Sequence, residues 1–155
     1  MTAITEGPVI GQECKLQYNT ATNASPSWTV VTRAINVDVS MPLGEAEIAS
    51  RQSAFKYKKG TLREIEITFT YQKKAGTDAV FDALQAAALA NTVYQWWVTD
   101  GTNTLTGAQG PKAFCQIFDM SLGQELENTE EVEFVLKATH TEESATLIEP
   151  TWAET

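Results

Sequence analysis

Residues 62–72, Leu62-Arg-Glu-Ile-Glu-Ile-Thr-Phe-Thr-Tyr-Gln72, form the most regular stretch of this 155-residue chain. Successive side chains of a β-strand point to opposite faces of the sheet. The stretch therefore predicts a strand with one face in a core and the other in water. The two faces are Ile65, Ile67, Phe69 and Tyr71 against Glu64, Glu66, Thr68 and Thr70.

Shorter alternating stretches lie on both sides of this strand and are separated by turn-forming residues. They predict further strands at residues 12–19, 28–41, 93–99, 113–122 and 131–140, the second being one long or two short strands. With 43% hydrophobic residues, the chain has enough apolar material for the core of one globular domain.

One segment has helical spacing instead of alternation. Val80, Phe81 and Leu84 fall on one face of a helix that we expect to begin after Thr77, its N-cap, and to end at Asn91. The sequence therefore predicts a mainly β fold: an antiparallel β-sandwich or barrel of about seven to eight strands with one flanking α-helix.

Two segments do not fit the alternation. Residues 42–60 follow neither period and predict a long loop or a protruding hairpin, a kind of segment that often carries function. Residues 141–155 form an acidic C-terminal tail, in which Leu147, Ile148 and Trp152 are candidates for docking on a neighbour. We therefore divide the chain into a domain at 1–140 and a tail at 141–155.

The net charge of −9 is distributed unevenly along the chain. Residues 51–74 hold seven bases and two acids, which gives +5, whereas residues 125–155 hold nine acids and one base, which gives −8. Such runs are either solvated faces or patches that meet on neighbouring copies of the chain. The acidic balance argues against sequence-independent binding of nucleic acid, which depends on neutralising phosphates.

The residues that catalysis or metal binding requires are missing from the sequence. His140 is the only histidine, and no serine or cysteine is placed beside it as a nucleophile. Two cysteines and one histidine are too few for a structural zinc site. Carboxylates two apart, such as Glu131 and Glu133, are typical of the wet face of a strand. We expect no enzyme activity, no cofactor and no metal.

The four tryptophans leave a second function class open. Trp96 and Trp97 are adjacent in a predicted strand and point to opposite faces, so one of them needs a cover outside the core. An exposed aromatic of this kind marks an interface. The alternative function is therefore a monomeric β-sandwich module that binds carbohydrate or peptide through Trp28 or Trp97.

Several stretches, taken in order, resemble the major tail tube proteins of long-tailed bacteriophages. They are Ala34-Ile-Asn-Val-Asp-Val-Ser, Glu64-Ile-Glu-Ile-Thr-Phe-Thr-Tyr, Thr77-Asp-Ala-Val-Phe-Asp-Ala-Leu and Trp97-Val-Thr-Asp-Gly, followed by a closing strand pair at 114–122 and 132–138. The resemblance covers nearly the whole chain as a pattern of elements. That family shares its fold with the tubes of contractile tails and of type VI secretion.

The resemblance implies a structural virion protein whose hexameric rings stack into a tube that delivers the genome. Its partners would be further copies of itself, the tail initiator and terminator proteins and the tape-measure protein, while DNA passes through without specific binding. No membrane is implied, and residues 1–8 lack the basic and apolar regions of a secretory signal, which favours synthesis in the bacterial host cytoplasm.

Two sets of candidate residues follow from the resemblance together with the charge pattern. The candidates for contact between rings are Arg51, Lys56, Lys58 and Lys59. The candidates for lining the channel are Glu64, Glu66, Thr68, Thr70, Glu131 and Glu133. An acidic wall of this kind would repel DNA and let it pass.

Overall fold

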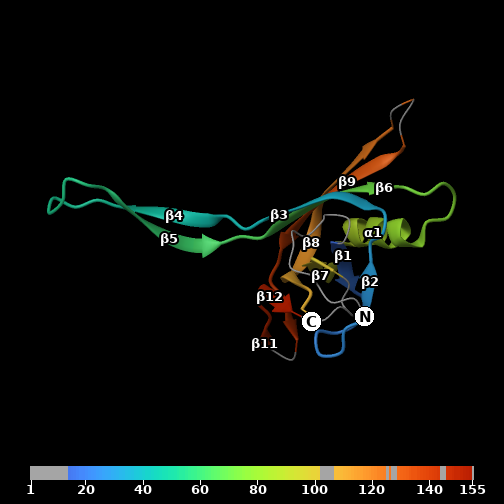
Figure 1. Ribbon diagram of the computed structural model, residues 1–155, viewed down its shortest axis with the longest axis horizontal. Helices are drawn as coiled ribbons and strands as arrows, with labels where there is room; N and C mark the ends of the chain where they lie inside the picture. Colours follow the sequence, from blue (N-terminus) through green and yellow to red (C-terminus); the bar gives the residue numbers. More distant parts are fainter. Residues whose placement is uncertain (1–13, 102–106, 125, 127–128, 144–145, 155) are drawn as a thin grey trace.

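The computed structural model describes residues 14–101, 107–124, 126, 129–143 and 146–154 (Figure 1). The described chain is mainly β with one helix, α1 (Ala79–Ala90). Its strands are β1 (Lys15–Asn19), β2 (Trp28–Val30), β3 (Ala34–Ser40), β4 (Leu43–Ile48), β5 (Tyr57–Arg63), β6 (Glu66–Gln72), β7 (Val93–Thr99), β8 (Gln109–Gly123), β9 (Glu131–Ala138), β10 (Glu142–Glu143), β11 (Thr146–Leu147) and β12 (Thr151–Glu154). The predicted fold class is confirmed.

The main sheet is antiparallel and has the order β2-β1-β7-β8-β9-β6-β3, with β12 added beside β8. The long strand β8 pairs with β7 through residues 112–116 and with β9 through residues 115–123, so it belongs to both halves of the sheet. The rings of Phe69 on β6 and Trp96 on β7 lie 5.8 Å apart, although these strands are not neighbours in the sheet. The sheet therefore folds over on itself around β8.

The core lies between the two halves of the bent sheet. Every second residue of β6 is buried, as the alternation predicts: Ile67, Phe69 and Tyr71 are at most 2% exposed. Phe69 stacks on Phe134 of β9, with 5.2 Å between the ring centroids. Burying these large side chains is the main source of stability.

Helix α1 covers one side of this core with Phe81, Leu84 and Ala87. Its N-cap is Asp78, one residue after the predicted Thr77, because the Asp78 carboxylate accepts a hydrogen bond from the Phe81 N–H. Asn91 ends the helix in the left-handed conformation, with φ 54°, and its N–H donates to the Ala87 carbonyl.

The strand predicted at 62–72 is interrupted. β5 ends at Arg63 and β6 begins at Glu66, so Glu64 lies outside both strands. The Glu64 N–H donates to the Pro42 carbonyl (3.0 Å), where the chain passes from the main sheet into a separate pair of strands. The alternation continues across this junction, which is why the sequence does not reveal the break.

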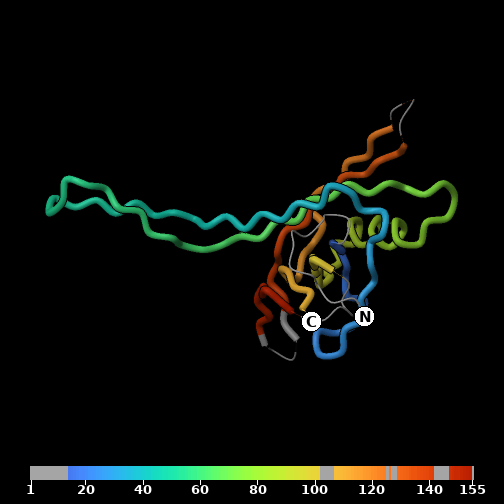
Figure 2. Tube along the Cα trace, in the orientation of Figure 1, coloured from blue at the N-terminus to red at the C-terminus, as the bar shows by residue number. Residues whose placement is uncertain are grey.

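Residues 43–63 form a hairpin of β4 and β5 (Figure 1). It includes nearly all of the segment predicted as a loop or hairpin, 42–60, and also Leu62 and Arg63, which the sequence predicts to begin the next strand. We call residues 43–63 the arm. It is a two-stranded sheet of its own and projects far from the body of the molecule, as the Cα trace in Figure 2 shows. All seven residues of β5 are exposed.

The acidic segment at the C-terminal end contributes a strand to the main sheet. Thr151–Glu154 forms β12 and pairs with residues 109–112 of β8, the part that β9 leaves uncovered.

Two points concern targeting and membranes. Residues 1–8, where the sequence lacks the regions of a secretory signal, lie outside the described residues. Over the part of the chain that the structure describes, no helix is both long and apolar enough to cross a bilayer.

Candidate functional surfaces

The predicted polar residues of β6 and β9 meet on one face of the sheet, opposite the core. Glu66 lies beside Lys137, Thr70 beside Glu133, and Gln72 beside Glu131, because directly paired residues of antiparallel strands share a face. The structure thus brings five of the six channel candidates together: Glu66, Thr68, Thr70, Glu131 and Glu133. Glu64, the sixth, is exposed at the junction outside β6.

The neighbouring strands extend this face on both sides. On β3, Asp38 pairs with Thr68 and Ser40 with Glu66. On β8, Asp119 pairs with Val135 of β9 and Ser121 with Glu133. We call this surface of β3, β6, β9 and β8 the polar face. Among the described residues that these pairings place on it are the carboxylates of Asp38, Glu66, Asp119, Glu131 and Glu133 and the ammonium of Lys137. Lys112, further along β8, lies over the rings of Trp28 and Trp97.

The four predicted contact cations all lie on the arm. Arg51 is in the turn, Lys56 precedes β5, and Lys58 and Lys59 are within it. Two of the four form ion pairs inside the arm: Lys58 with Glu45 (2.8 Å) and Lys56 with Glu47 (3.2 Å). Exposed pairs of this kind are worth about 0–1 kcal/mol, so these lysines can exchange partners at low cost.

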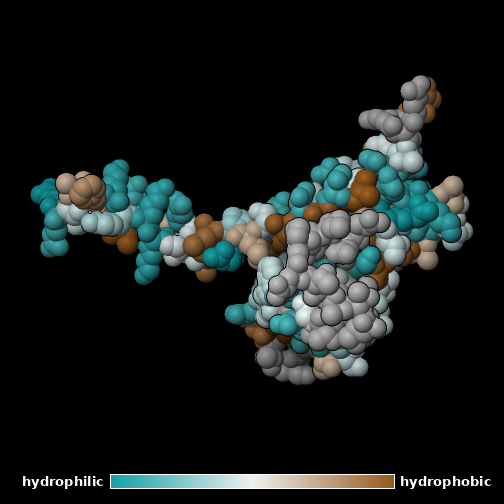
Figure 3. Space-filling model, in the orientation of Figure 1, coloured by the Kyte–Doolittle hydropathy of each residue, from teal (hydrophilic) through white to brown (hydrophobic). Residues whose placement is uncertain are grey.

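The arm also exposes large apolar side chains. Phe55 is 74% exposed and Leu62 84%, and three more are at least 45% exposed: Leu43, Ile48 and Tyr57. Figure 3 shows brown, apolar patches along the arm among teal, polar ones. A two-stranded hairpin alone is only marginally stable in water, and exposed apolar surface of this extent marks an interaction site. The arm is therefore suited to contact another molecule.

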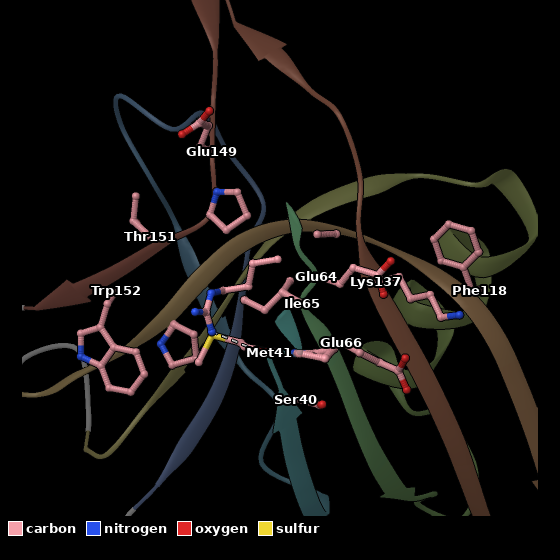
Figure 4. A pocket seen from close by; sticks show the side chains of 15 residues that line it. Ser40, Met41, Glu64, Ile65, Glu66, Phe118, Lys137, Glu149, Thr151 and Trp152 are labelled. Atoms are coloured by element: carbon pink, nitrogen blue, oxygen red, sulfur yellow. Dashed lines mark hydrogen bonds between the residues drawn. The ribbon is translucent and has the colours of Figure 1, made fainter. Parts of the chain in front are cut away.

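A groove lies beside the root of the arm. Its volume is about 760 Å³, and its walls come from the end of β3, the junction before β6, the middle of β8 and the segment leading into β12. Figure 4 shows Trp152 and Phe118 at opposite ends, with Met41, Ile65 and Glu66 between them. Of the three residues that the sequence predicts to dock on a neighbour, Leu147, Ile148 and Trp152, only Trp152 lines this groove. The rest of the groove depends on how distant segments come together.

The tryptophans do not form an open platform. Trp97 is 5% exposed, packs on Trp28 at 5.3 Å between ring centroids, and donates from Nε1 to the Gly110 carbonyl (3.2 Å). Trp28 is thus the cover that the sequence required for Trp97. Trp97 is not available to a ligand, which removes one of the two anchors of the alternative binding module.

The groups with shifted pKa values have structural roles. Burial raises the pKa of the Cys115 thiol to about 12, so it stays protonated in the core. Burial and a hydrogen bond to Asp78 raise the pKa of the Tyr71 hydroxyl. Among the described residues, no three His, Cys, Asp or Glu side chains are grouped so that they could hold a metal ion.

This fold, a bent antiparallel sheet with one flanking helix and a long hairpin, is similar to that of several solved tail and tube structures. No protein-family model matches the sequence, and no curated protein matches it. The SPP1 tail tube is similar with a TM-score of 0.71 and 18% identity, over 96% of this chain and 80% of that chain. The tail of the empty gene transfer agent (GTA) particle has a TM-score of 0.66 at 10% identity, over 90% and 97%.

A chain of the PVC sheath-tube complex, an extracellular contractile injection system, has a TM-score of 0.65 at 9% identity and covers 100% of both chains. The similar structures therefore include two tails and a contractile injection system. The predicted resemblance to phage tail tube proteins is confirmed for the fold.

Proposed function

We propose that this chain is a structural virion protein that assembles as stacked hexameric rings into a phage tail tube, the channel for genome delivery. The observation that carries the proposal is the polar face: a broad, net acidic surface on a sheet whose other side is the core. A wall with this charge repels the phosphates of DNA, which then passes without binding.

The edges of the sheet support assembly through strands. In the described residues, β2 pairs only with β1, and β3 pairs only with β6, so each has one unpaired edge. Unpaired edges favour pairing with another chain, and closing a sheet into a barrel removes them. Rings joined at these edges would place the polar faces of all subunits around one channel. The GTA tail was refined with C6 symmetry, which supports six subunits in a ring.

The proposed role is not enzymatic and needs no cofactor. Its partners are further copies of the chain, the tail initiator and terminator proteins and the tape-measure protein, and its location is the virion tail after synthesis in the bacterial host cytoplasm. Arg51, Lys56, Lys58 and Lys59 lie at the contact between rings, on an arm long enough to leave its own subunit.

The test is negative-stain electron microscopy of the purified chain at its highest soluble concentration, together with a sizing column. The proposal expects tubes or six-fold rings and an apparent mass that rises with concentration. A chain that stays monomeric contradicts the proposal and favours the alternative, a carbohydrate- or peptide-binding module. A screen of carbohydrate and peptide ligands, comparing the wild type with Trp28→Ala, would then test that alternative.

A further inference from the structure

The groove beside the arm root has an aromatic side chain at each end, with charged and apolar side chains between them. Its two largest side chains are still open to solvent, Trp152 at 61% and Phe118 at 58%. A register shift between Ile117 and Asp119 means that Phe118 is not paired with any residue of β9 in the sheet. Exposed aromatic side chains in a groove offer contacts to a further aromatic group.

Three carboxylates and two cations line the groove, and Glu66 lies beside Lys137 in the pairing of β6 with β9. Its walls carry Glu64, Glu66 and Glu149, and no ion pair joins any of them to a cation in the described part of the chain. The two cations in the walls have other contacts. Arg63 donates to the Met41 carbonyl (3.2 Å), and the Lys137 ammonium lies 5.9 Å from the Phe118 ring centroid. An occupant that combines an aromatic ring with a positive charge could contact both the exposed aromatic side chains and the carboxylates of this groove.

The tip of the arm has this chemistry. Phe55 is 74% exposed there, with Arg51 and Lys56 close to it along the chain. Hydrogen bonds shape the turn: Ser53 Oγ accepts from the Phe55 N–H (3.1 Å) and lies 3.3 Å from the Tyr57 hydroxyl. A tip already ordered before contact loses less entropy on binding.

The tip cannot enter the groove of its own chain. Ten residues separate Pro42 at the root from residue 52 in the turn, a span of about 33 Å at the rise of a β-strand. The arm extends away from the body of the molecule (Figures 1 and 2). The occupant must therefore come from a second copy.

We propose that the arm tip of one copy docks in the groove of the next, with Phe55 between Trp152 and Phe118 and Arg51 facing the groove carboxylates. The contact joins two different surfaces, so it repeats from copy to copy and generates an open stack. Aromatic and arginine side chains in desolvated pockets carry most of the binding energy at interfaces. This inference rests on the proposed stacking of rings and names the surface that receives the arm.

Disulfide trapping tests this contact directly. In a Cys14→Ser background, Ala54→Cys places a thiol beside Phe55 and Glu149→Cys places one on the groove wall, both at exposed positions. Oxidation should link chains head to tail and give a ladder of three or more chains on a non-reducing gel. The control pairs Ala54→Cys with Leu89→Cys on the outside of α1, where the exposed fraction is 75%. It should give monomers and dimers only.

The outcomes separate this contact from tube formation itself. Tubes seen by electron microscopy without a ladder overturn the docking but leave the proposed function intact. A ladder without tubes supports the docking and contradicts the tube, while the absence of both contradicts both.

A second measurement does not depend on engineered thiols. Phe55→Ser should raise the concentration needed for assembly at least tenfold, while Leu62→Ser, also on the arm but away from the tip, should change it less than twofold. Equal effects of the two substitutions would overturn the role of Phe55. Circular dichroism confirms that both variants fold.

Discussion

The Tyr71 hydroxyl lies 2.8 Å and 2.9 Å from the two carboxylate oxygens of Asp78, and so joins strand β6 to the start of α1. The carboxylate also accepts hydrogen bonds from the N–H groups of Lys74 (3.1 Å) and Phe81 (3.2 Å). Burial alone would raise the pKa of Asp78, but these three donors outweigh it and lower the pKa. The ionised carboxylate thus fixes the helix on the sheet.

Tyr71→Phe should therefore destabilise the fold. Removing a buried hydrogen bond to a charged group costs about 1.5–3 kcal/mol. Urea unfolding of the wild type, Tyr71→Phe, Asp78→Asn and the double variant gives the coupling energy between the two side chains. Strictly additive losses would contradict the contact.

The same carboxylate predicts how stability depends on pH. The pKa of Asp78 is lower in the folded chain than in the unfolded chain, so its ionised form favours folding. This stabilisation is complete above the unfolded pKa of about 3.9 and is lost as the pH falls through the lower, folded pKa. The stability difference between wild type and Asp78→Asn should be constant near neutral pH and shrink below about pH 4. A difference that grows in acid would contradict this assignment.

Gly110 should tolerate no side chain. A Cβ atom there would lie 1.6 Å from the Val98 carbonyl oxygen, a backbone atom that cannot turn aside. Gly110→Ala should cost about 3 kcal/mol or more, or prevent folding, since the strands must separate. Gly123→Ala in the same strand is the control, because the nearest atom to its Cβ is 3.8 Å away. Thermal melts of the two variants should differ clearly, and equal melting temperatures would show that β7 and β8 can shift apart.

Reversing two charges on the arm should weaken assembly and leave the fold intact. Lys58→Glu with Lys59→Glu removes one exposed ion pair and makes the arm acidic. We expect assembly to need a roughly tenfold higher concentration, by repulsion between like charges across the contact. Lys73→Glu with Lys74→Glu, outside the arm, is the matched control for net charge. Unchanged assembly of the arm variant would rule out a role for these lysines between rings.

Placing a positive charge on the polar face should make assembled tubes retain DNA. Glu133 is exposed on that face, and Glu133→Lys adds one cation per subunit that can neutralise phosphate. Short DNA fragments should co-sediment with tubes of this variant at low salt and be released as salt rises. Asp82→Lys on the helix makes the same charge change elsewhere. If both variants retain DNA equally, the polar face does not line the channel.

Periodicity predicts the elements that pack against a core. Alternation predicts β6 and β9, and helical spacing predicts α1. Each of these elements buries one face, and this burial places apolar residues at regular intervals in the sequence. The arm has no core and buries almost nothing, so its sequence has no period that would indicate strands. The choice between loop and hairpin therefore depended on pairing that only the structure supplies.

The candidate residues divide in the same way. Glu66, Thr68 and Thr70 meet Glu131 and Glu133 because strand faces follow from alternation, once β6 and β9 are known to be neighbours. The position of Glu64 could not be predicted, since the strand breaks where the arm begins. The groove could not be predicted either, because Met41, Phe118 and Trp152 come from three distant segments.

The short strand β12 brings one wall of the groove to the sheet. Glu149, Pro150, Thr151 and Trp152 all follow the other strands along the chain, whereas the arm is made much earlier. In polymer terms the full chain is a monomer with two reactive ends, a tip that inserts and a groove that receives. A chain stopped before Glu149 would keep the tip but lose the wall that carries Trp152. It would act as a chain terminator, joining a growing stack once and offering the next subunit no place to bind.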